Sequence, residues 1–157
     1  MKRRRLFWHG IFLFFLGLLS GVLVQTMTNP RMGLAAHTSG VASGTFLAVL
    51  GAVWSELRLG TRAEGAAYWL AVYGAYAGWA AVQLAAIFGT SRMTPIAGAG
   101  HNAPAYQEAI VNFGLATGAA ALLVACTLLL RGPSCFGASA DVGSRRDACA
   151  RYVSERL

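Results

Sequence analysis

The charge of this chain is concentrated at its two ends, and the long middle is almost entirely apolar. Of its 157 residues, 12% are charged and 56% are hydrophobic, whereas an ordinary globular protein has about 25% charged residues. Residues 2–5 are all lysine or arginine, and further basic residues follow Arg131. The mean hydropathy is +0.53. The apolar centre is long enough to cross a hydrocarbon layer of about 30 Å several times, which indicates a polytopic membrane protein.

Four apolar stretches have the length and composition of membrane-spanning helices. Their predicted bounds are about 6–26, 34–57, 66–88 and 105–130. The first two are separated at Asn29-Pro30, because proline disfavours helical backbone at the residue before it. Glycines in the first span mark faces where another helix can approach closely. The sequence therefore predicts an all-α fold, a polytopic integral membrane four-helix bundle over 1–131, followed by a largely flexible basic cytoplasmic tail over 132–157.

The basic residues predict the orientation of the bundle. With four spans, both termini lie on one side of the membrane, which also receives Arg58 and Arg62 from the second connection. The opposite side receives Arg31 and Arg92. By the positive-inside rule, we expect both termini to be cytoplasmic and the protein to lie in the inner (cytoplasmic) membrane. The apolar core 6–24 is longer than that of a signal peptide, so we expect it to be retained.

The composition and motifs argue against several function classes. The net charge of +7 fits basic ends at an anionic membrane surface, so no nucleic acid partner is expected. The histidines, His9, His37 and His101, lie in different segments without the paired spacing of a zinc site. The cysteines form no CxxC pair and are expected to be free thiols. His9, near the end of the first span, is expected either at the membrane interface or at the mouth of a pocket.

A single histidine, His37, lies about one turn inside the second apolar stretch. Burying an unpartnered imidazole costs on the order of 1–3 kcal/mol, so the pattern predicts a partner. Small residues recur beside it, at Ala36, Gly40 and Gly44, and they leave room for something flat and bulky. Two interpretations stay open: a hydrogen bond within the bundle, or ligation of a haem, which needs as little as one protein ligand.

Polar side chains in the last two spans are further candidates for a site. Tyr76 and Gln83 fall roughly on one face of the third span, and an amide at that depth must hydrogen-bond within the bundle. Trp79 is expected to pack in the core or against lipid. Glu108 and Asn112 are one turn apart on the fourth span. Near a helix start, Glu108 also interacts favourably with the helix dipole.

Three separated motifs resemble one family. The stretch NPRMGLAAHTSGVASGTFLAVLG, the motif YGAYAGW, and MTPIAGAGH followed by QEAIV are similar to segments of the hydroxylaminobenzene mutases, small four-helix membrane proteins. They begin at Asn29, Tyr73 and Met93, and the resemblance covers about residues 6–130. The part AHxxG…G around His37 also resembles styrene oxide isomerase. That distant relative is a trimer and binds haem b through this histidine.

The resemblance implies a homotrimeric isomerase in the lipid bilayer that uses ferric haem b on a small aromatic substrate. His37 would ligate the iron, a Lewis acid, with Gly40 and Gly44 beside it. A hydroxylaminoarene would become a 2-aminophenol by intramolecular hydroxyl transfer, without net redox change. The polar groups of the pocket would be Tyr76, Gln83, Glu108 and Asn112. Two alternatives are an epoxide-to-carbonyl isomerase of the styrene oxide type and a non-enzymatic haem-binding membrane protein.

Two positions depart from the family pattern. Where the mutases carry an asparagine just before the position of Gly44, this chain has Ser43. Where they carry YANW, it has YAGW, with Gly78 in place of the asparagine. In styrene oxide isomerase the first of these asparagines touches the substrate. Ser43 is therefore predicted to line a reshaped pocket, and the substrate of this chain need not be that of the family.

Overall fold

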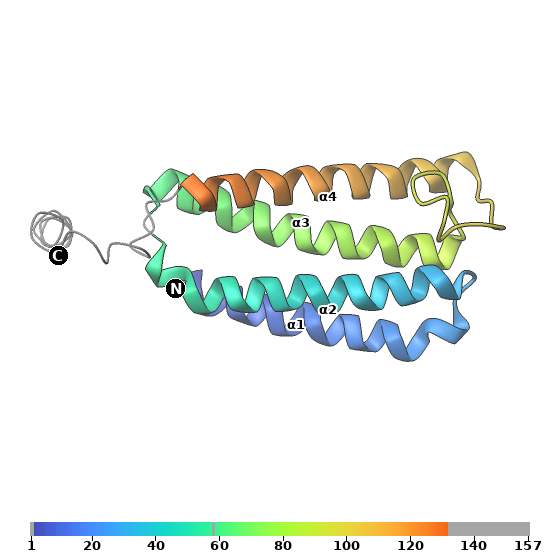
Figure 1. The fold of residues 1–157 in the computed structure, drawn as a ribbon, viewed down its shortest axis with the longest axis horizontal. Coiled ribbons are helices and arrows are strands. Elements are labelled where there is room, and N and C mark those ends of the chain that lie inside the picture. The colour runs from blue at the N-terminus through green and yellow to red at the C-terminus, as the bar shows by residue number, and fades with distance from the viewer. Residues whose placement is uncertain (1, 58, 132–157) are drawn as a thin grey trace, which may run out of the picture.

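The computed structural model describes residues 2–57 and 59–131, and four long helices follow one another there (Figure 1). Arg58 and the predicted tail 132–157 lie outside the described part. Each long helix is apolar and long enough to cross a membrane, so the prediction of an all-α, multi-pass membrane protein is confirmed. The elements, in order, are α1 (Lys2–Leu23), η1 (Val24–Thr26), α2 (Pro30–Val53), η2 (Trp54–Glu56), α3 (Thr61–Phe88) and α4 (Ala105–Arg131).

The first three long helices begin earlier than the apolar pattern predicts. For α2 the reason is Asn29, whose Oδ1 accepts from the backbone N–H groups of Arg31 and Met32, at 3.1 and 3.3 Å. With this cap, Pro30 fits the first helical position, where its missing N–H is not needed. The first residues of α1 and α3 include charged side chains, which lie outside the predicted apolar spans. Helix ends are therefore set by capping and by interfacial charge as well as by hydropathy.

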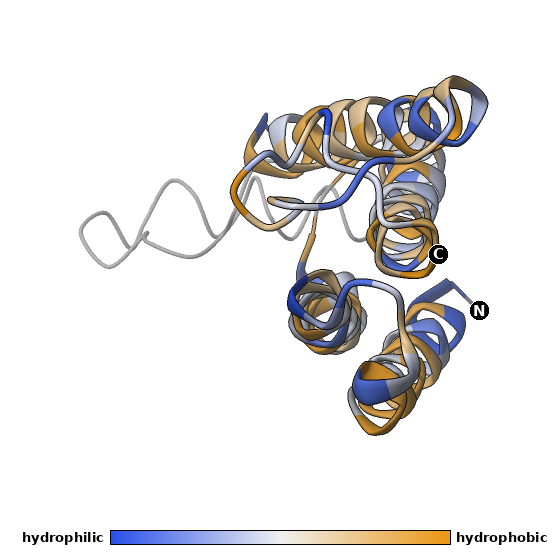
Figure 2. Cartoon of the chain, turned by 90° about the vertical axis from the view of Figure 1, so that its right-hand side faces the viewer, coloured by the Kyte–Doolittle hydropathy of each residue, from blue (hydrophilic) through white to orange (hydrophobic). Residues whose placement is uncertain are grey.

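The helices pack as two antiparallel pairs, α1 with α2 and α3 with α4. Viewed end-on, the α1–α2 pair lies below the α3–α4 pair (Figure 2). The two pairs are joined mainly where α2 contacts α3, whereas α1 contacts α3 far less. One side of the bundle, between α1 and α3, is therefore loosely packed.

Glycines bring α1 and α2 into close contact. A Cβ added at Gly17 would lie 2.6 Å from the backbone nitrogen of Val41, and one at Gly40 would lie 2.6 Å from the Cα atom of Gly17. Gly44 meets the backbone of Phe14 in the same way. These contacts leave no space for a side chain, so the prediction that the glycines of the first span form a packing face is confirmed.

Hydrogen bonds fasten the turn between α1 and α2 to the second helix pair. Asn29 is 1% exposed. Its Nδ2 donates to the carbonyl oxygen of Ala97 at 2.9 Å. Its backbone N–H donates to the carbonyl oxygen of Ala86 at 3.0 Å. The Nε2 atom of His101, in the loop between α3 and α4, lies 3.1 Å from the carbonyl oxygen of Thr28. This end of the bundle is thus held as one unit.

Candidate functional site

His37 lies on α2 and turns its imidazole toward α1. Its Nδ1 lies 2.8 Å from the carbonyl oxygen of Gly17. A carbonyl oxygen only accepts, so this bond places the proton on Nδ1 and leaves the lone pair of the neutral ring on Nε2. The predicted partner of the histidine within the bundle is therefore a backbone group, one that no side-chain pattern reveals.

The imidazole occupies a place that glycine leaves open. A Cβ added at Gly21 would lie 2.6 Å from Nδ1 of His37 and 3.1 Å from its Cγ and Cε1 atoms. Gly21 is one turn beyond Gly17 on α1, so the two glycines lie together beside the imidazole. We call this pair of glycines the seat of His37. The carbonyl oxygen of Gly17 accepts the hydrogen bond from Nδ1, and the absence of a side chain at Gly21 leaves room for the ring.

The second ring nitrogen of His37 is left open. In residues 2–57 and 59–131, Nε2 makes no hydrogen bond and is not one of the enclosed unpartnered polar atoms, and the residue is half-buried. Histidines that bind a metal almost always donate the other ring N–H to a carbonyl or carboxylate, which fixes the tautomer and raises the basicity of the ligating nitrogen. The geometry of His37 thus fits a ligand histidine.

The small residues beside His37 are covered. Gly40 and Gly44 lie against α1, and the indole of Trp79 reaches Gly40 from α3. A Cβ added at Gly40 would lie 2.8 Å from Cδ1 and 2.9 Å from Nε1 of that indole. In this chain the surface formed by Gly40 and Gly44 is therefore covered by α1 and Trp79. The predicted contact of these glycines with a cofactor stays a prediction.

Three polar atoms are enclosed without a partner among the described residues. They are Nε1 of Trp79, Oε1 of Gln83 and Oδ1 of Asn112. The Nε2 atom of Gln83 donates to the sulfur of Met27 at 3.8 Å, a weak acceptor. Each unpaired atom costs about 1–3 kcal/mol, so a polar partner would stabilise each of these groups. Trp79 was missed as a polar candidate, although its spacing of three from Tyr76 and four from Gln83 places it beside them on α3.

Glu108 holds a loop. The residue is 7% exposed, and its Oε1 and Oε2 accept from the backbone N–H groups of Ser91 and Arg92, at 2.9 and 3.2 Å. Both belong to the loop between α3 and α4. The carboxylate is thus already engaged by the protein, and its predicted place in a substrate pocket stays a prediction.

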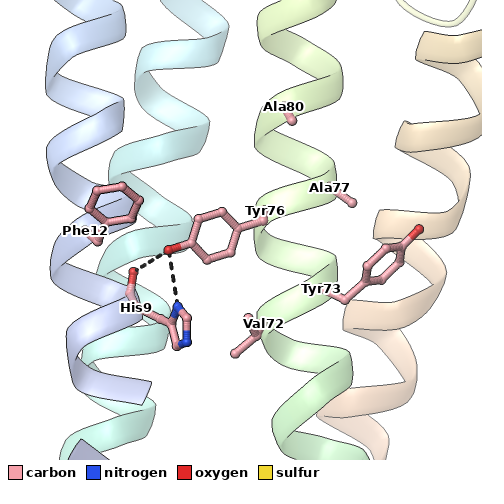
Figure 3. A pocket seen from close by; sticks show the side chains of 7 residues that line it. All are labelled: His9, Phe12, Val72, Tyr73, Tyr76, Ala77 and Ala80. Carbon is pink, nitrogen blue, oxygen red and sulfur yellow. Dashed lines mark hydrogen bonds between the residues drawn. The ribbon is translucent and has the colours of Figure 1, made fainter. Parts of the chain in front are cut away.

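Tyr76 lies with His9, in a pocket between α1 and α3 (Figure 3). The phenol oxygen of Tyr76 lies 3.3 Å from the carbonyl oxygen of His9 and 3.4 Å from its Nδ1, and the two rings meet edge to face at 5.8 Å. His9 thus lines a pocket, and its expected place at the membrane interface stays a prediction. The cavity has a volume of about 620 Å³ and is lined by His9, Phe12, Val72, Tyr73, Tyr76, Ala77 and Ala80.

Three of the predicted site residues lie in different surroundings. Tyr76 lies beside His9, Glu108 lies beneath the loop, and Ser43 is half-buried on α2. A Cβ added at Gly78 would meet no atom within 4 Å, so the chain has free space where the family pattern has an asparagine.

Known proteins resemble this chain along most of its length. A model of the styrene oxide isomerase family matches residues 2–133. The chain belongs to the styrene oxide isomerase family. Hydroxylaminobenzene mutase HabB of Ectopseudomonas oleovorans is 49% identical over 130 residues, which cover 82% of this chain and 79% of that protein. Hydroxylaminobenzene mutase HabA of the same organism is 41% identical over 128 residues, covering 81% and 95%.

No solved structure matches this member of the family. The resemblance predicted from the three motifs is confirmed, and the chain is an enzyme of the isomerase class, of the mutase type.

Proposed function

We propose that this isomerase converts a hydroxylaminoarene into a 2-aminophenol and uses ferric haem b bound to His37. The observation that carries the proposal is the imidazole of His37, with Nδ1 bonded to the carbonyl of Gly17 and Nε2 open. The printed names of both relatives, hydroxylaminobenzene mutases, support the substrate class. Substrate and product are isomers, so the reaction needs no external oxidant or reductant.

The residues of the chain would bind the haem and the substrate, orient both, and shield the reacting groups from water. The carbonyl of Gly17 keeps the proton of His37 on Nδ1, so that Nε2 remains the ligating atom. When bound, ferric haem supplies a Lewis-acidic iron for the rearrangement. The apolar helices exclude bulk water from the reacting groups. The proposed contacts to the polar part of the substrate are Ser43, Tyr76, Gln83 and Asn112, with Glu108 acting through the loop that it holds.

We further propose a homotrimer in the inner (cytoplasmic) membrane, with both termini cytoplasmic. The trimer is suggested by the resemblance of the His37 segment to styrene oxide isomerase. The orientation is supported by charge. The end where α1 begins and α4 ends (Figure 1) carries residues 2–5, Arg62 and Arg131, whereas Arg31 and Arg92 are at the other end.

The experiment compares His37→Ala with the wild type after reconstitution with haemin in detergent. We expect a Soret band and conversion of phenylhydroxylamine to 2-aminophenol without reductant in the wild type, and loss of both in the variant. His101→Ala is the matched control, a histidine of the loop between α3 and α4. A His37→Ala protein that keeps the full Soret band and full activity would rule out the ligand assignment.

A second candidate function is the isomerisation of an epoxide to a carbonyl compound. The match to the styrene oxide isomerase family model favours it. Styrene oxide in place of phenylhydroxylamine, in the same assay, distinguishes the two candidates by the product that forms faster.

A further inference from the structure

His9, which lines the pocket between α1 and α3, lies apart from the seat of His37. His9 is eight residues before Gly17 on the same helix, a separation of about 12 Å along the axis. It also lies on a different side of α1, toward α3 rather than α2.

The pocket is apolar except for the pair of His9 and Tyr76. Figure 3 shows the imidazole and the phenol meeting across the space between the helices. Both short contacts are satisfied at once if the Tyr76 hydroxyl donates to the carbonyl oxygen of His9 while Nδ1–H of His9 donates to the phenol oxygen. In this arrangement Nε2 of His9 is an acceptor. It has no partner among the described residues and is not enclosed.

We propose that this pocket binds a small aromatic molecule whose hydroxyl or amino group donates a hydrogen bond to Nε2 of His9. The volume of about 620 Å³ lies within the range of ligand pockets, about 300–1,000 Å³. Phe12 and Val72 offer the ring apolar contacts, and Ala77 and Ala80 leave it space. A lipid chain would fill the same space but offers Nε2 no hydrogen-bond donor.

The position of the pocket suits capture from the membrane. It lies on the side of the bundle where α1 and α3 pack loosely. A second pocket of about 580 Å³ also borders His9 and extends to Arg4, Arg5 and Trp8 at the basic end. An amphipathic aromatic molecule at the membrane interface can therefore reach His9 from the headgroup level. The binding needs neither haem nor His37, although the pocket shares Tyr76 with the contacts proposed for the substrate.

The test measures binding of two fluorinated probes to the full-length protein in nanodiscs by fluorine NMR. The probes are 4-fluorophenol, which can donate a hydrogen bond, and 4-fluoroanisole, which cannot. We expect the phenol to bind about five- to tenfold more tightly, the effect of one hydrogen bond. His9→Phe should abolish this preference, and His9→Gln, which keeps an acceptor, should retain part of it. His101→Gln is the matched control and should leave the preference unchanged.

A second pair of variants tests the location of the ligand. Ala80→Phe, which fills the pocket, should weaken both probes at least tenfold, whereas Ala119→Phe, on the exposed surface of α4, should not. Equal affinity for the two probes in the wild type, or unchanged binding in Ala80→Phe, would overturn the proposal, as would a preference that disappears in His37→Ala. Displacement of both probes to the same extent by a long-chain alkane would instead identify a lipid site.

Discussion

The imidazole of His37 rests on Gly21, where any side chain would displace it. A Cβ at this position would lie 2.6 Å from Nδ1, well inside van der Waals contact. We therefore predict that Gly21→Ala breaks the bond to the carbonyl of Gly17 and weakens haem binding about 10- to 100-fold, the usual effect of losing a supporting contact of a ligand histidine. Titration with haemin, followed at the Soret band, measures the affinity.

The control for this substitution is Gly65→Ala. Gly65 also lies within a helix, but a Cβ added there meets no atom within 4 Å. This variant should bind haem as the wild type does. If Gly21→Ala also binds haem normally, the contact with Gly17 does not orient the ligand.

Ser43 and Gly78 are the positions where this chain lacks asparagines of the family pattern. Gly78 has free space beside it, and Ser43 is half-buried, so both can take the larger side chain. We predict that Ser43→Asn with Gly78→Asn raises kcat/KM for phenylhydroxylamine about tenfold over that of the wild type, because an amide adds a hydrogen bond worth about 1 kcal/mol or more. Parallel assays of the variant and the wild type measure the change, and an unchanged kcat/KM would show that these positions do not contact the substrate.

At the scale of elements, the loop between α3 and α4 depends on the carboxylate of Glu108. Glu108→Ala would leave the backbone N–H groups of Ser91 and Arg92 without their acceptor. We predict faster hydrogen exchange at these two amides and a free energy of unfolding lower by about 1–3 kcal/mol. Exchange measured by mass spectrometry, together with thermal unfolding in detergent, tests both effects.

Glu108→Gln distinguishes a loop-holding role from a chemical one. The amide oxygen can still accept from one of the two N–H groups, so this variant should recover part of the protection and most of the activity. If Glu108→Gln has a protected loop but no activity, the carboxylate acts on the substrate.

The helices themselves were predictable from sequence, because a span of the bilayer needs about 20 apolar residues and each stretch meets this requirement. Their starts were less predictable. The cap of Asn29 places Pro30 inside α2, and the helical start of α3 at Thr61 lies in a polar segment where hydropathy gives no signal. Local hydrogen bonds decide the boundary of α2, whereas α3 begins at Thr61 without a side-chain cap.

The site was only partly predictable. His37 stood out as an isolated imidazole in an apolar helix, but its partner is the carbonyl of Gly17, which depends on how α1 and α2 are aligned. The pairing of His9 with Tyr76 joins residues 67 apart in the chain. No local spacing encodes such a contact, since it arises from the packing of α1 beside α3.

At the scale of the whole molecule, the two ends of the bundle differ in how they are held. The end with the turn between α1 and α2 is fastened by Asn29, Thr28 and Glu108 through bonds to backbone groups. At the other end, Lys2 lies 3.5 Å from Glu64, which also accepts from the indole N–H of Trp54 at 3.1 Å. The first end uses uncharged groups for most of its bonds, whereas the second gathers basic side chains suited to an anionic membrane surface.

This difference leads to a prediction of the topology. Arg62 and Arg92 are both exposed and lie at opposite ends of the bundle. In a background without the three native cysteines, Arg92→Cys should react with a membrane-impermeant maleimide in intact spheroplasts, and Arg62→Cys should react only after the membrane is opened. The reason is that translocating the more basic end is disfavoured. The reverse labelling would place the termini outside, and the cysteine-free background, which should stay unlabelled, shows that each signal comes from the introduced thiol.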